Sequence, residues 1–142
     1  RVYNGIVQGI LKEEEGTIKG AIGRDPNNRL RMAINEKNGK PAVTHYKVLS
    51  SNNGYSFCAF QLETGRTHQI RVHMASKNHP LLGDPLYGPK NPPVKHLDGQ
   101  CLHARTIGFV HPTTGEYVEV EAPLPAYFKD LLKRFDLVES SK

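Results

Sequence analysis

Apolar and polar residues alternate along several stretches of the chain, as they do in β-strands. Residues 42–49 and 55–62 are two such stretches, and the turn residues Asn53 and Gly54 stand between them, which predicts an antiparallel hairpin. Residues 100–110 and 116–121 predict a second hairpin. Further strands are predicted at residues 3–11 and 17–22.

Two other stretches show the spacing of amphipathic helices. From about residue 67 to residue 78, apolar side chains recur four positions apart, and Thr64 or Thr67 is placed to cap the helix. After Pro125, a stripe of aromatic and leucine side chains predicts a second helix. The pattern therefore predicts one α+β domain, mostly antiparallel sheet with two main helices.

The composition narrows the possible partners and compartments. The 142 residues carry 19 Lys and Arg against 14 Asp and Glu, and the formal net charge of +5 favours a polyanionic partner such as nucleic acid. No apolar run approaches the roughly 20 residues of a membrane span, and no signal-peptide pattern is seen, so we expect a cytoplasmic protein. Cys58 and Cys101 lie among apolar residues, which predicts two buried free thiols.

Polar side chains are densest between residues 62 and 88. Arg66, His68, Gln69 and Arg71 occupy the start of the first predicted helix. Arginine and the free N–H groups of a helix start bind phosphate and carboxylate groups, and Gln and His can bind ribose or base edges. On spacing alone, a merely solvated helix face is an equally good interpretation.

An arginine-rich loop precedes this region. Arg24, Arg29 and Arg31 lie among the turn residues of the stretch 23–32. Such a loop is a candidate for phosphate contacts, although spacing alone favours a solvated loop.

Metal and hydrolase chemistry are poorly supported. His68 and His73 are five residues apart and do not share a helix face as metal ligands four apart would, so we expect no metal site. A hydrolase would need paired carboxylates, and Glu63 with Asp84 is the best pair available. Asp84 is better explained as a partner for an arginine or for backbone N–H groups.

Six short segments nevertheless form a family pattern when they are taken in order. They are residues 22–26 (IGRDP), 31–33 (RMA), 39–42 (GKPA), 62–74 (LETGRTHQIRVHM), 83–88 (GDPLYG) and 102–104 (LHA). The run G-R-T-H-Q-I-R-V-H-M is the most specific of them. Across essentially the whole chain, the pattern resembles the RluA family of RNA pseudouridine synthases.

This resemblance implies isomerisation of uridine to pseudouridine within RNA, expected to be ribosomal RNA, without a metal or organic cofactor. The bond from ribose to uracil N1 breaks, the ring turns, and a bond to C5 forms. The family's essential aspartate lies in an H-R-L-D-type motif that this chain lacks. We therefore expect the motif to precede Arg1 in a parent protein, the chain to be the C-terminal portion of a catalytic domain, and the chain alone to be inactive.

The resemblance also implies roles for individual residues. Tyr3 matches the tyrosine that stacks on the uracil and serves as a base toward the C5 proton. Arg71 matches the arginine that pairs with the catalytic aspartate, so it is expected to be an unpaired cation here. Leu102 matches the apolar wall opposite the tyrosine. Arg66, His68 and Gln69 should border the pocket, and Arg24, Arg29 and Arg31 should contact the flanking RNA.

One rival function belongs to another class. A non-catalytic RNA-binding module with a vestigial pocket would carry the same residues, and an intact aspartate upstream would argue against it. In a truncated synthase, sheet edges that the missing upstream strands leave exposed could also promote self-association of the chain.

Overall fold

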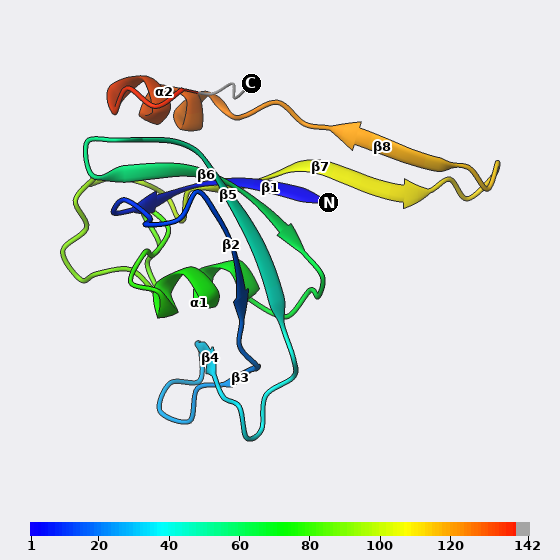
Figure 1. Cartoon of the computed structure of the whole chain (residues 1–142), viewed down its shortest axis with the longest axis horizontal. Coiled ribbons are helices and arrows are strands. Elements are labelled where there is room, and N and C mark those ends of the chain that lie inside the picture. Colours follow the sequence, from blue (N-terminus) through cyan, green and yellow to red (C-terminus); the bar gives the residue numbers. More distant parts are fainter. Residues whose placement is uncertain (139–142) are drawn as a thin grey trace.

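A six-stranded antiparallel sheet forms the centre of the computed structural model, which describes residues 1–138 (Figure 1). Its order is β2-β5-β6-β1-β7-β8, and a two-stranded arm, β3-β4, lies apart from it. The sheet strands are β1 (Val2–Gln8), β2 (Glu15–Lys19), β5 (Val43–Asn52), β6 (Tyr55–Leu62), β7 (Leu102–Val110) and β8 (Tyr117–Glu121). The arm consists of β3 (Ile22–Arg24) and β4 (Met32–Ile34), and the helices are α1 (Gln69–Ser76) and α2 (Ala126–Arg134). The predicted α+β class and both predicted hairpins are confirmed.

The two helices cover opposite faces of the sheet (Figure 1). Successive side chains of a strand point to opposite faces. Ile6 and Phe57 accordingly pack with Phe128 of α2, whereas Val7 packs in a separate cluster with Met74 of α1. The central strands β1 and β6 are therefore buried on both faces.

The predicted strand 17–22 is divided in the structure. β2 ends at Lys19, and β3 begins at Ile22 in the arm. Between them, the Gly20 carbonyl oxygen lies 2.9 Å from Nε2 of His73, and the Ala21 N–H donates to Oε2 of Glu36 at 3.0 Å. These side chains come from elsewhere in the chain, so the interruption could not be predicted from the local pattern.

Helix α1 begins later than predicted. Neither Thr64 nor Thr67 caps it, and its N-cap residue, His68, has a left-handed backbone with φ of 57°. The Thr64 hydroxyl instead accepts the Val43 N–H at 3.0 Å and donates to Oε1 of Gln69 at 2.8 Å. The predicted threonine cap is therefore wrong, because this hydroxyl binds the start of β5.

His73 ties α1 to the sheet and to the start of the arm, and it is fully buried. Because a carbonyl oxygen can only accept a hydrogen bond, Nε2 of His73 is protonated and donates to the Gly20 carbonyl oxygen. Nδ1 then accepts a hydrogen bond from the Thr44 hydroxyl at 2.8 Å. Burial lowers the pKa of His73, and the charge of Lys77 lowers it further, which together outweigh the opposite effect of the Gly20 carbonyl. The folded chain therefore holds this ring neutral.

We predict that His73 makes the chain less stable in mild acid. A histidine in the unfolded chain has a pKa of about 6.5. Since the pKa of His73 is lower in the folded chain, the unfolded chain binds more protons once the pH drops below about 6.5. Stability that is present above about pH 6.5 is therefore lost as the pH falls toward the folded pKa. In urea unfolding, the free energy of unfolding should fall more between pH 7.5 and pH 5.5 for the wild type than for His73→Gln. The difference between the two falls should be at most ~1.4 kcal/mol per pH unit. His111→Gln, in an outer turn, is the control, and equal falls in the wild type and His73→Gln would contradict the assignment.

Candidate active site

The predicted pocket residues line one small hollow, here called the Tyr3 pocket, with a volume of about 170 Å³. Tyr3 of β1 pairs with Ala104 of β7, and Gly5 pairs with Leu102. Tyr3 and Leu102 therefore stand diagonally on the same sheet face. The remaining lining comes from the end of β6, the following turn and the start of α1: Leu62, Arg66, His68, Gln69, Ile70 and Arg71.

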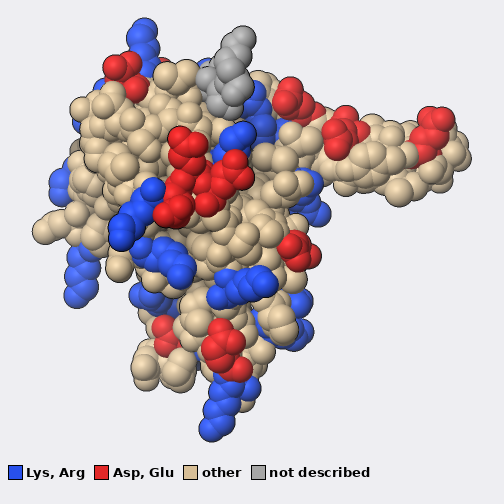
Figure 2. Space-filling view, viewed as in Figure 1, with Lys and Arg blue, Asp and Glu red and all other residues tan. Residues whose placement is uncertain are grey.

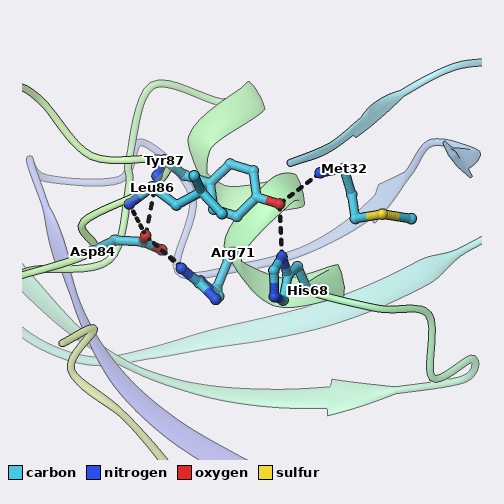
Figure 3. Close-up of polar contacts among 6 residues, drawn as sticks. All are labelled: Met32, His68, Arg71, Asp84, Leu86 and Tyr87. Atoms are coloured by element: carbon cyan, nitrogen blue, oxygen red, sulfur yellow. Dashed lines mark hydrogen bonds and ion pairs between the residues drawn. The ribbon is translucent and has the colours of Figure 1, made fainter. Parts of the chain in front are cut away.

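Arg71 is paired, so the expectation of an unpaired cation is wrong. Its Nε donates to Oδ2 of Asp84 and its Nη2 to Oδ1, both at 2.9 Å (Figure 3). Oδ1 also accepts the backbone N–H groups of Leu86 at 2.9 Å and Tyr87 at 3.0 Å. The prediction that Asp84 binds an arginine or backbone N–H groups is confirmed on both counts.

Asp84 is placed by a loop that is tied to the sheet. The Leu82 N–H donates to the Ile6 carbonyl in β1, and the Cys101 N–H, just before β7, donates to the Leu82 carbonyl, both at 2.8 Å. Gly83 then turns the chain with φ of 80°, where a Cβ atom would come within 2.6 Å of the Gly99 carbonyl oxygen. This local geometry brings a carboxylate to an arginine from a different element.

The pair remains charged in the folded chain. Burial alone would raise the pKa of Asp84, but hydrogen bonds from Arg71, Tyr87 and Leu86 and the charge of Arg71 lower it to a net value below the ordinary one. The Asp84 side chain is 0% exposed and both its oxygens are engaged, so it is not placed to act as a nucleophile. A guanidinium has five N–H bonds, and Asp84 takes two of them, which leaves three for the pocket.

Gln69 lines the pocket with a side chain whose polar atoms are engaged internally. Oε1 accepts the Arg66 N–H at 2.9 Å and the Thr64 hydroxyl, while Nε2 donates to the Val43 carbonyl at 3.0 Å and to Thr44 Oγ1 at 2.9 Å. The residue is 3% exposed. Gln69 therefore holds the turn before α1 against β5, and its amide is not free to bind a base.

The three arginines predicted to contact RNA do not all line one hollow. Arg24 and Arg29 line an open hollow at the tip of the arm, and Arg24 shares a second hollow with Arg66 beside the start of α1. Arg31 points elsewhere: its guanidinium lies 5.0 Å from the ring centroid of Tyr87 and 3.7 Å from Asp25. On the visible face, several Lys and Arg side chains lie on the lower part of the molecule, where the arm is, with Asp and Glu side chains among them (Figure 2).

Tyr87 was not predicted as a site residue, although it stands in the G-D-P-L-Y-G segment. Its hydroxyl oxygen lies 2.8 Å from the Met32 nitrogen of the arm and 2.8 Å from Nδ1 of His68 (Figure 3). The residue is 8% exposed. The motif could have drawn attention to it, but its partners could not be identified from sequence spacing.

Other candidate chemistries gain no support from the geometry. Glu63 binds His45 and Asp84 binds Arg71, so the two carboxylates form no pair with each other. Within residues 1–138, no three His, Cys, Asp or Glu side chains gather as metal ligands, and no helix there is both long and apolar enough to cross a membrane.

Cys58 and Cys101 are free and buried as predicted, and burial raises the pKa of each thiol to about 12.

Known proteins that are similar to this chain are RNA pseudouridine synthases. The family model described as RNA pseudouridylate synthase matches residues 1–76. The chain is 48% identical over 133 residues to an uncharacterized RNA pseudouridine synthase of Bacillus subtilis, covering 94% of this chain and 43% of the relative. It is 51% identical over 134 residues to the ribosomal large subunit pseudouridine synthase D of Neisseria meningitidis, covering 88% of this chain and 36% of the relative.

A solved structure is also similar. The human RNA pseudouridylate synthase domain containing 1 matches 99% of this chain and 66% of its own, with a TM-score of 0.75 and 27% identity. The chain spans about two fifths of the length of the two bacterial relatives described above. Matches to the family model, to the relatives and to the solved fold agree with the resemblance of the motifs to the RluA type, and the chain belongs to the RNA pseudouridylate synthase family.

Proposed function

We propose that the complete protein containing this chain is an RNA pseudouridine synthase that acts on ribosomal RNA, and that the chain is the C-terminal portion of its catalytic domain. The observation that carries this proposal is the Tyr3 pocket, which gathers Tyr3, Arg71 and Leu102 from three separate elements. The ribosomal substrate rests on the name of the Neisseria relative. We also propose that the complete protein acts in the cytoplasm.

The pocket residues suit the reaction. Tyr3 and Leu102 offer an aromatic ring and an apolar wall for a uracil that has left its helical stack. Arg71, held by Asp84, has three N–H groups left for the catalytic aspartate that we place upstream of Arg1. No cofactor is required, because the reaction breaks one bond from ribose to N1 and makes one to C5, with a proton leaving C5 and another reaching N1.

Loss of the C5 proton provides the test. Unmodified ribosomal RNA labelled with tritium at uridine C5 should release tritium to water when it is incubated with the complete protein. RNA binding without any release would favour the non-catalytic binding module. Release from transfer RNA alone would keep the chemistry and refute the ribosomal substrate.

Self-association is a further proposal, and the β7-β8 ribbon supports it. Ile107 pairs with Val120 and Phe109 with Val118, so these two neighbouring pairs place four apolar side chains on one face of the ribbon. Ile107 is 40% exposed, Phe109 43% and Val120 49%. β8 is also an outer strand of the sheet, which leaves a row of backbone groups without a neighbouring strand.

We predict that the sedimentation coefficient of the chain rises with concentration and that Val120→Lys suppresses this rise. The substitution places a charge on the apolar face, which opposes its burial against a second copy. Thr114→Lys adds the same charge in the turn beyond the strands and should leave association unchanged. A chain that stays monomeric at every concentration would refute self-association.

A further inference from the structure

The hydroxyl of Tyr87 joins two parts of the site that are distant in sequence. The Met32 N–H of the arm donates to it at 2.8 Å, and Nδ1 of His68, at the N-cap of α1, lies 2.8 Å away (Figure 3). His68 lines the Tyr3 pocket. One buried oxygen therefore lies between the arm and the pocket.

The hydrogen bonds around this oxygen favour one tautomer of His68. A backbone amide can only donate, so Tyr87 receives a hydrogen bond from Met32 and has its own proton left to donate. Within residues 1–138, Nδ1 of His68 is the acceptor within reach of that proton. A neutral imidazole that accepts at Nδ1 carries its proton at Nε2.

The surroundings favour the neutral ring. Partial burial lowers the pKa of His68 and the nearby charge of Arg71 lowers it further, against a smaller opposite effect of Asp84. Nε2 makes no hydrogen bond within the described part of the chain. His68 thus has one N–H available at the rim of the pocket.

The ring of Tyr87 adds a second connection. The guanidinium carbons of Arg31 and Arg71 each lie 5.0 Å from its centroid. Arg31 lies in the loop that joins the two strands of the arm, and Arg71 lines the pocket. Cation–π attraction therefore acts on both sides of the link that the hydroxyl makes.

We propose that Tyr87 is a positioning residue that holds His68 as the Nε2–H tautomer, so that His68 can donate a hydrogen bond to an oxygen of the RNA in the Tyr3 pocket. The same hydroxyl couples this donor to the arm through Met32. This inference rests on the proposed function only for the identity of the acceptor, because the tautomer exists without RNA.

The test is nitrogen NMR of the histidine rings in the 15N-labelled chain, first without RNA. In the wild type, His68 should show the pattern of a protonated Nε2 and an accepting Nδ1. In Tyr87→Phe, which keeps the ring, the ratio of the two tautomers should fall about fivefold, as expected for the loss of one hydrogen bond. Exchange of the Met32 amide should quicken by at least about the same factor. Tyr117→Phe, on the outer ribbon, should change neither.

A protonated Nδ1 in the wild type would overturn the proposal without any variant. An unchanged tautomer ratio in Tyr87→Phe would overturn it as well. A uridine-containing RNA oligonucleotide is then added to the wild type, and the Nε2 resonance of His68 should shift. An oligonucleotide that binds without moving this resonance would refute the role of His68 as a donor, whereas failure to bind would count against the proposed function and leave the tautomer result intact.

Discussion

Asp84→Asn should lower the free energy of unfolding by about 3–5 kcal/mol, although the two side chains have nearly the same shape. The variant leaves the guanidinium of Arg71, which is 12% exposed, without the carboxylate that neutralises it. An asparagine oxygen can still accept the N–H groups of Leu86 and Tyr87, so the loop retains much of its support. The expected loss therefore comes mainly from a buried cation without a counter-ion.

Chemical unfolding of the wild type and the variant at pH 7 measures this loss. Asp130→Asn, on the exposed face of α2, removes the same charge and should cost little. The pH dependence gives a second check. Because the folded pKa of Asp84 lies below that of the unfolded chain, its contribution is present above about pH 4 and is lost as the pH falls further. A loss in Asp84→Asn no larger than that of the control would show that Arg71 needs no partner.

Tyr3→Phe in the complete protein should lower kcat for pseudouridine formation by about 10²–10⁴-fold, the usual contribution of a general base. The phenyl ring remains to stack on the uracil, so KM should change little. Tyr55→Phe is a suitable control, because its ring packs against Phe135 away from the pocket. Equal kcat values for Tyr3→Phe and the wild type would remove the Tyr3 hydroxyl from the mechanism and leave the ring with a stacking role.

Much of the fold could be predicted because short-range patterns determine it. Strand 55–62 is observed with the predicted bounds, and both hairpins follow from turns between alternating stretches. The errors arose where side chains from distant segments intervene. His73 and Glu36 interrupt the predicted strand at Gly20 and Ala21, and Thr64 binds β5 instead of capping α1.

The site was predictable as a set of residues but not as a set of contacts. The family resemblance identifies Tyr3, Arg71 and Leu102, and the fold brings them to one pocket. The sequence predicts an arginine partner for Asp84 but does not identify it as Arg71, thirteen residues earlier, and the resemblance pairs Arg71 with an aspartate outside the chain instead. The direction in which a side chain points could not be predicted from the sequence either. The Gln69 amide faces inward, and the Tyr87 hydroxyl joins the arm to His68.

The most direct measurement is the pseudouridine content of unmodified ribosomal RNA after incubation with the complete protein or with this chain alone. The nucleosides of the digested RNA are separated and counted. We predict pseudouridine with the complete protein and none with the chain, because the catalytic aspartate is proposed to lie upstream. Pseudouridine formed by the chain alone would contradict the proposed division of the site. RNA that the complete protein binds but leaves unmodified would contradict its assignment as a synthase.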